Sequence, residues 1–255
     1  MRLPVTDLVA AQPLKYARGL TSELAAACGE RLLAGYLHGS AVLGGWTEER
    51  SDVDVLVIVA DDIDVTKIDA AKEILIAARE DCPGRGLEIS LVTAAEAAVP
   101  GPPFGFVLHG GDQRLVDGAD VPGGDDDLLM HYAVCLAAGY ALLGPPPRAL
   151  IGPVGRPALL SYLAAELDWG LTNAPECYAV LNACRALEFT LTGQIMSKVD
   201  GGISALRRGL EPTDLIARAL DQQRGLAAPQ SCGPEAVAFA GEIQTLIRAA
   251  IVTVT

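Results

Sequence analysis

The spacing of apolar residues changes from segment to segment in the first half of the chain. Residues 55–59 are apolar without polar alternation, which is typical of a short strand buried on both faces. Residues 66–79 carry apolar side chains at helical spacing, with charges on the other face. In residues 86–92 apolar positions alternate with the others, which is typical of a strand. We predict an earlier strand over residues 33–37. The pattern predicts strands and a helix in a small mixed sheet.

Helical spacing dominates the second half of the chain. We predict five helices there, over residues 158–170, 176–192, 203–209, 213–223 and 234–252. Stretches rich in glycine, proline and aspartate indicate loops at residues 118–127 and 144–157. We therefore expect an α/β (α+β) domain with a small mixed sheet over residues 1–150 and an all-α helical bundle over residues 151–255. A helix that begins near Asp126 can belong to either domain.

Length and charge narrow the kind of protein. The 255 residues exceed one average domain, and 51% of them are hydrophobic, which is enough for two cores. The net charge of −13 argues against binding to nucleic acids or anionic membranes, which attract clustered lysine and arginine. It favours a cationic partner, although an acidic surface can also serve solubility alone.

No segment near the N-terminus reads as a signal peptide, because polar residues and prolines interrupt it, and no run reaches membrane-spanning length. We therefore expect a cytoplasmic protein. The six cysteines form no Cys-x-x-Cys pair, so we expect most of them to be small core residues. Of the histidines, His38 follows a strand, whereas His109 and His131 have no partner that the pattern reveals.

The candidate chemistry begins with Asp52 and Asp54, at the start of the apolar strand. Side chains two apart on a strand point to the same face, so both carboxylates can bind the same metal ions. Magnesium prefers oxygen ligands and usually takes one or two carboxylates together with substrate phosphates and water. Two acids therefore form half of a site that a nucleotide completes.

Gly39 and Ser40 lie shortly before Asp52 in the chain and provide the other half of the nucleotide site. Glycine lets the backbone approach a phosphate closely, and Ser40 can open a short helix whose free N–H groups favour anions. Glu88 is the charged residue on one face of the strand at 86–92. Because a helix connects the two strands, we expect Glu88 beside the aspartate pair. Each motif alone is common in turns or strand ends, and the combination on the expected elements carries the prediction.

These residues resemble the nucleotidyltransferase superfamily, and within it the aminoglycoside O-adenylyltransferases that inactivate streptomycin and spectinomycin. The superfamily resemblance rests on residues 37–42, 51–57 and 88–92. Further segments resemble this branch alone, at residues 127–131, 142–146, 180–185 and 191–198.

The resemblance implies a transfer of AMP from ATP to a drug hydroxyl with two Mg²⁺ ions. Asp52 and Asp54 match the aspartates that bind magnesium, Ser40 with Gly39 matches the phosphate-binding turn, and Ser51 matches a serine that contacts the nucleotide. Glu88 matches the general base. Alternatively, Glu88 is a third metal ligand, and the sequence does not separate the two roles.

Arg185 and Lys198 match cationic positions that reach the triphosphate from the helical domain. Such cations suit the departure of pyrophosphate, which carries concentrated negative charge. The alternative is that both are solvated surface charges. If the resemblance holds, both cations face the three acids across a cleft between the domains.

The drug-binding residues are the least defined. Counting back from Arg185, a family aspartate aligns with Pro175, and the nearest acid is Glu176. Asp112 stands where the family has a tryptophan. These departures argue against streptomycin itself. Glu176, Asp112 and Asp168 remain the candidates for binding ammonium or guanidinium groups, although acids near helix starts also serve the helix dipole.

Three functions are compatible with the sequence. The first is an ATP-dependent aminoglycoside adenylyltransferase with a cationic drug as partner. The second is a nucleotidyltransferase that acts on another small molecule or on a protein, as antitoxin-type regulators do. The long helical second domain favours a small molecule. The third, a binding protein without activity, does not require a base on the third strand.

Overall fold

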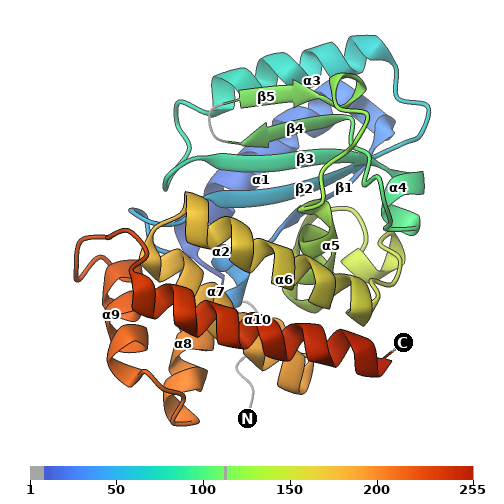
Figure 1. Cartoon of the computed structure of the whole chain (residues 1–255). Coiled ribbons are helices and arrows are strands. Elements are labelled where there is room, and N and C mark those ends of the chain that lie inside the picture. The colour runs from blue at the N-terminus through green and yellow to red at the C-terminus, as the bar shows by residue number, and fades with distance from the viewer. Residues whose placement is uncertain (1–8, 112–113, 255) are drawn as a thin grey trace, which may run out of the picture. The chain divides into compact units, whose positions relative to one another are not determined.

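A computed structural model describes residues 9–111 and 114–254 of the chain. The chain divides between Val154 and Gly155 into two compact units. The first unit contains the sheet and the second is entirely helical, as predicted (Figure 1). None of the helices within the described residues is long and apolar enough to cross a membrane.

A six-stranded sheet forms the centre of the first unit, in the order β5-β4-β3-β2-β1-β6. β2 and β3 are parallel, and every other neighbouring pair is antiparallel, so the sheet is mixed. The strands are β1 (Leu32–Leu37), β2 (Val53–Val59), β3 (Leu87–Thr93), β4 (Leu108–Gly111), β5 (Arg114–Asp117) and β6 (Tyr140–Leu143).

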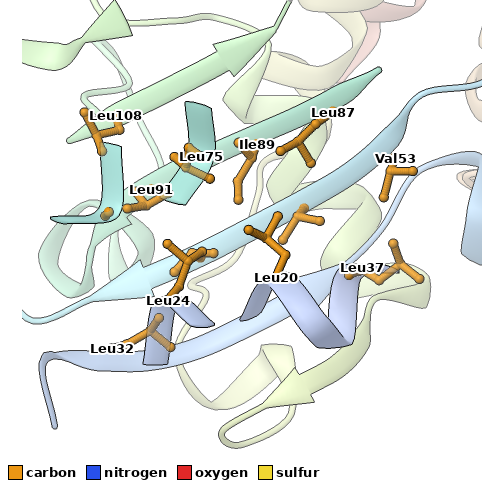
Figure 2. Packing of buried hydrophobic residues seen from close by; sticks show 14 of the residues in the cluster. Leu20, Leu24, Leu32, Leu37, Val53, Leu75, Leu87, Ile89, Leu91 and Leu108 are labelled. Atoms are coloured by element: carbon orange, nitrogen blue, oxygen red, sulfur yellow. The ribbon is translucent and has the colours of Figure 1, made fainter. Parts of the chain in front are cut away.

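The main core of this unit covers one face of the sheet. Helices α1 (Ala11–Cys28) and α3 (Val65–Ala78) contribute Leu20, Leu24 and Leu75 to a layer of apolar side chains over the strands (Figure 2). From β2 and β3, every second residue points into this layer, including Val53 and Leu87. The residues between them therefore point to the opposite face, on which Asp54 and Glu88 lie.

Shorter elements complete the first unit. They are η2 (Gly29–Arg31), α2 (Ser40–Leu43), α4 (Ala94–Ala98), η3 (Gly118–Asp120), α5 (Leu128–Ala138) and η4 (Pro147–Ala149). α5 contributes His131 to the face that carries Glu88, because the two side chains are hydrogen-bonded. α1 and α5 place helices over opposite faces of the sheet.

The second unit consists of α6 (Arg156–Asn173), α7 (Glu176–Thr192), α8 (Lys198–Arg207), α9 (Thr213–Gln223) and α10 (Pro234–Val254). α7 is the most buried of these helices, with twelve buried residues. Polar contacts join the helices of this unit. Glu188 of α7 accepts two hydrogen bonds from Arg208, the residue that follows α8. Gln244 of α10 donates to the carbonyl of Ala164 in α6 at 2.8 Å.

The predicted start of one helix was wrong. The pattern predicted a helix from Ile203, whereas α8 begins at Lys198. Ser197 caps it, since the serine hydroxyl accepts from the Asp200 N–H. Gly201 and Gly202 lie inside this helix, where a Cβ on Gly201 would lie 2.9 Å from the backbone of α7 and one on Gly202 would lie 2.7 Å from Leu181 of α7. Close packing of the two helices outweighs the low helix propensity of glycine.

Four of the six cysteines are buried, in agreement with the prediction that most are core residues: Cys28, Cys135, Cys177 and Cys184. The short strands β4, β5 and β6 were not predicted. Each has only four residues, so apolar periodicity has little length over which to show itself.

Candidate active site

The backbone of Gly39 lies directly against the carboxylate of Asp54. Gly39 has φ +63°, and a Cβ there would lie 1.8 Å from Oδ2 of Asp54. The N–H of the preceding residue, His38, donates to the carbonyl oxygen of Asp54 at 2.9 Å. β1 and β2 therefore bring the glycine turn and the aspartate together, and only glycine fits at this point.

Asp54 and Glu88 are register partners on the parallel strands β2 and β3. The adjacency that the strand–helix–strand pattern predicts is confirmed by this register. Asp52 lies two residues ahead of Asp54, just before β2 begins. Burial raises the pKa of Asp54 well above its ordinary value, and the charges of Glu88 and Asp52 raise it further. The site thus concentrates carboxylates that repel one another.

These carboxylates fit Mg²⁺ by chemistry, because hard oxygen ligands suit this ion and a cation would offset their repulsion. In the part of the chain that the structure describes, no group of three or more His, Cys, Asp or Glu residues is arranged to hold a metal ion. Magnesium sites usually rely on one or two carboxylates and complete their shell with phosphates and water. Asp52 and Asp54 are the candidates for that pair.

Glu88 has a partner that the sequence pattern did not reveal. Nε2 of His131 lies 3.0 Å from Oε1 of Glu88, and the two side chains are 13% and 30% exposed. Burial disfavours both charged forms, but the hydrogen bond and the opposite charges outweigh it. The pKa of Glu88 falls to about 2 and that of His131 rises to about 9. Glu88 is therefore held ionised and in a fixed position.

The sequence pattern revealed no partner for His131 or His109, and the structure gives both of them one. His109 Nδ1 lies 3.0 Å from the Ser90 hydroxyl and 3.5 Å from Asp125. For His131 the sequence did contain a signal. It lies on α5 three residues after Leu128, beside the buried side of that helix, and a polar residue there needs a partner.

The third histidine, His38, is buried, and its ring centroid lies 4.8 Å from that of His131. Burial and the charge of His131 lower the pKa of His38 to about 3. Of these two neighbouring histidines, His38 is therefore neutral and His131 carries the charge at neutral pH.

The shifted pKa of His131 gives a pH-dependent prediction. In the metal-free protein, we expect the His131 imidazole to titrate near pH 9 in an NMR titration, and Glu88→Gln to move the midpoint down towards 6.5. Because the pKa is raised on folding, protonated His131 stabilises the fold fully below pH 6.5, and this stabilisation is lost as the pH rises through 9. The resonance is assigned by its loss in His131→Gln. A midpoint near 6.5 in the wild type would contradict the ion pair.

Both candidate serines precede the aspartates in the chain. Ser40 is the first residue of α2, directly after Gly39. Ser51 is buried, and its hydroxyl accepts from the Thr47 N–H at 3.0 Å. Ser51 thereby closes the turn that leads into Asp52.

The two candidate cations for the triphosphate, Arg185 and Lys198, lie in the helical unit. Arg185 is half-buried on α7, and among the described residues its Nε is buried without a hydrogen-bond partner. Lys198 opens α8, with its ammonium group 4.3 Å from the centre of the Tyr178 ring. A Cβ on Gly201 would lie 2.8 Å from the Cβ of Arg185, so α8 approaches α7 closely at this residue. That these cations face the three acids stays a prediction.

Two of the three predicted drug-binding acids, Glu176 and Asp168, have partners in the second unit. Glu176 is only 2% exposed. Its carboxylate accepts hydrogen bonds from three side chains: Arg218 at 2.9 and 3.3 Å, Gln222 at 3.2 Å and Gln230 at 2.7 Å. Asp168 lies 3.4 Å from Arg248, with both side chains 61% exposed. Asp112 lies outside the described residues. These contacts show that Glu176 joins α7 to α9 through a buried ion pair, and a role in binding the drug stays a prediction.

Comparisons with known proteins agree with the two units. Residues 25–97 match the nucleotidyltransferase domain family, and residues 156–245 match the C-terminal domain of aminoglycoside adenylyltransferases. The fold is similar to the crystal structure of spectinomycin adenyltransferase AAD(9) from Enterococcus faecialis with ATP and spectinomycin. The TM-score is 0.68 at 16% identity, over 92% of this chain and 98% of that one. No curated protein sequence matches the chain significantly.

Proposed function

We propose that this chain transfers AMP from ATP to an antibiotic hydroxyl. The premise is that it belongs to the aminoglycoside adenylyltransferases of the nucleotidyltransferase superfamily. The products are the adenylylated drug and pyrophosphate, and the modification gives resistance. We place the reaction in the cytoplasm, where ATP is available.

The observation that carries this proposal is the pairing of Asp54 with Glu88 on parallel strands, with Gly39 against the aspartate. Asp52 and Asp54 would hold two Mg²⁺ ions together with the triphosphate, and the ions would neutralise the phosphate charges. The glycine permits the triphosphate to approach the backbone, and Ser40 and Ser51 flank this position.

Glu88 accepts the proton of the attacking hydroxyl in this proposal. A sugar hydroxyl is a poor nucleophile until a base within hydrogen-bond reach takes its proton. His131 donates to Oε1 of Glu88 and keeps the carboxylate ionised at neutral pH. One carboxylate oxygen is therefore fixed by α5, and the carboxylate also hydrogen-bonds the Asp54 side chain, next to the proposed magnesium ligands.

Arg185 and Lys198 bind the triphosphate and stabilise the departing pyrophosphate. Both suit this role because nucleotidyl transfer depends on charge neutralisation and alignment. The buried Nε of Arg185, without a partner among the described residues, is a donor available to an anion.

The acceptor is a cationic aminocyclitol, and spectinomycin is the first one to test because the structurally similar AAD(9) holds it together with ATP. The net charge of −13 fits a cationic substrate. The acids proposed for the drug are Glu176, Asp112 and Asp168.

Glu176 is also expected to affect stability. Glu176→Gln should lower the free energy of unfolding by about 2 kcal/mol, since it breaks a buried ion pair whose arginine is partly exposed. Thermal unfolding should show a midpoint several degrees lower. Glu235→Gln is the control, because Glu235 forms an ion pair with the same arginine, Arg218, but its side chain is 53% exposed. Equal stability of the two variants would contradict the structural role of Glu176.

The direct test of the function is magnesium-dependent release of pyrophosphate from ATP in the presence of spectinomycin, streptomycin and other aminoglycosides. The mass of the product shows whether one adenylyl group was added, and Asp52→Asn is the inactive control. Release with one drug, lost in the control, would establish the reaction and its acceptor. If no drug causes pyrophosphate release although the protein still binds ATP, the proposal of an antibiotic substrate is wrong. A protein or another small molecule would then be favoured as the acceptor.

A further inference from the structure

Tyr178 contacts Lys198, one of the two candidate triphosphate-binding cations of the helical unit. It lies on α7, two turns before Arg185, and the ammonium group of Lys198 sits over its ring at 4.3 Å from the centroid. We propose that Tyr178 is a positioning residue, which holds the ammonium group of Lys198 ready for the triphosphate of ATP. This inference rests on the proposed function, in which Lys198 binds that triphosphate.

The tyrosine ring is itself held in place from α6. Its hydroxyl donates a hydrogen bond to Oε1 of Glu166, and Nδ2 of Asn182 lies 3.5 Å from the same oxygen. The Trp169 ring meets it edge-on, with centroids 5.8 Å apart. A Cβ on Gly170 would lie 3.2 Å from the tyrosine ring, so this glycine makes room for it.

The hydroxyl remains a donor across the working pH range. Burial raises the pKa of Tyr178 well above its ordinary value, and the charge of Glu166 raises it further. The ring is therefore neutral, and its face is available to a cation. Ammonium groups bind the faces of aromatic rings at distances within about 6 Å.

The position of Lys198 depends on α8 as well. Ser197 caps this helix, and Gly201 brings it against the backbone of α7 at Arg185. The backbone fixes where the lysine begins, but a four-carbon chain can still place its ammonium group in many directions. The contact with Tyr178 restricts these directions before the nucleotide arrives, so less side-chain entropy is lost on binding.

The consequence is a coupling between Tyr178 and Lys198 in ATP affinity. We would measure binding of Mg²⁺–ATP to the full chain by calorimetry, without acceptor. Lys198→Ala should weaken binding by about tenfold to a hundredfold, as expected for a charge-assisted contact. Tyr178→Leu should weaken it by about threefold to thirtyfold, and Tyr178→Phe, which keeps the ring, by much less.

The decisive variant combines both changes. Tyr178→Leu introduced into Lys198→Ala should weaken ATP binding by less than about twofold, because the ring acts through the lysine. Tyr140→Leu is the matched control, since Tyr140 also lies near a cation, Arg18, but in the first unit. Thermal unfolding of each variant checks that the fold is retained.

The outcomes separate the two proposals. If the wild type binds ATP and the losses from Tyr178→Leu and Lys198→Ala simply multiply, the positioning role is overturned and the proposed function stands. If Tyr178→Phe loses as much affinity as Tyr178→Leu, the hydroxyl matters rather than the ring, which also overturns it. If the wild type binds no ATP, the proposed function falls and the inference falls with it.

Discussion

Glu88→Gln is expected to lower kcat for AMP transfer by about a hundredfold to ten-thousandfold, while ATP and the antibiotic still bind. Glutamine has nearly the same shape and can accept the hydrogen bond from His131, but it cannot take the proton of the attacking hydroxyl. The measurement is the steady-state rate of pyrophosphate release, with binding of Mg²⁺–ATP and of the drug measured separately by calorimetry.

Glu73→Gln is the matched control, because Glu73 is an exposed glutamate on α3, over the opposite face of the sheet. Its rate should equal that of the wild type. The same experiment separates the two roles that the sequence left open for Glu88. A base gives a lower rate at every magnesium concentration, whereas a third metal ligand gives a rate that recovers when magnesium is raised. Unchanged turnover in Glu88→Gln would rule out the base.

The part of the site that could be predicted lies on consecutive strands. Two parallel strands joined by a helix are usually neighbours in the sheet, so the strand of Glu88 is expected next to that of Asp54, where the structure has it. Alternation along each strand then places both acids on one face. These are local rules, and they do not depend on the rest of the chain.

The contacts that could not be predicted join residues far apart in the sequence. Nothing in the pattern of residues 128–138 says which strand α5 covers, so the bond from His131 to Glu88 depends on tertiary packing. Glu176 is similar, because an acid in the first turn of a helix suits the dipole, a ligand or an ion pair equally well. Its partner Arg218 lies on a different helix.

The charges along α7 show how the helical unit presents its cations. Its two buried acids, Glu176 and Glu188, are each bonded to an arginine from elsewhere in the unit, Arg218 and Arg208. The negative charge of α7 is therefore neutralised internally, and these acids do not oppose Arg185. A helix that carries two acids and one arginine can thus still offer positive charge to a triphosphate.

Gly39→Ala is expected to reduce the rate of AMP transfer by about a hundredfold or more, since a displacement of about 1 Å in a catalytic group can have this effect. The new methyl group would lie 1.8 Å from Oδ2 of Asp54, so the carboxylate has to move away from the position in which it faces Glu88. The substitution also forces alanine into a backbone conformation that strongly favours glycine, which costs about 1–3 kcal/mol. Loss of activity alone would therefore not distinguish the clash from a weaker fold.

The chain contains a control for the cost of placing alanine in this backbone conformation. Gly29 has φ 59° and ψ −138°, close to the 63° and −148° of Gly39, but a Cβ there meets nothing within 4 Å. Gly29→Ala should therefore lower the thermal midpoint about as much as Gly39→Ala while its rate of pyrophosphate release stays near that of the wild type. If both variants lost activity equally, the loss would come from the backbone and not from Asp54. If only Gly39→Ala loses it, the closeness of this glycine to the aspartate is a requirement of the chemistry, because the two variants differ in what the methyl group touches.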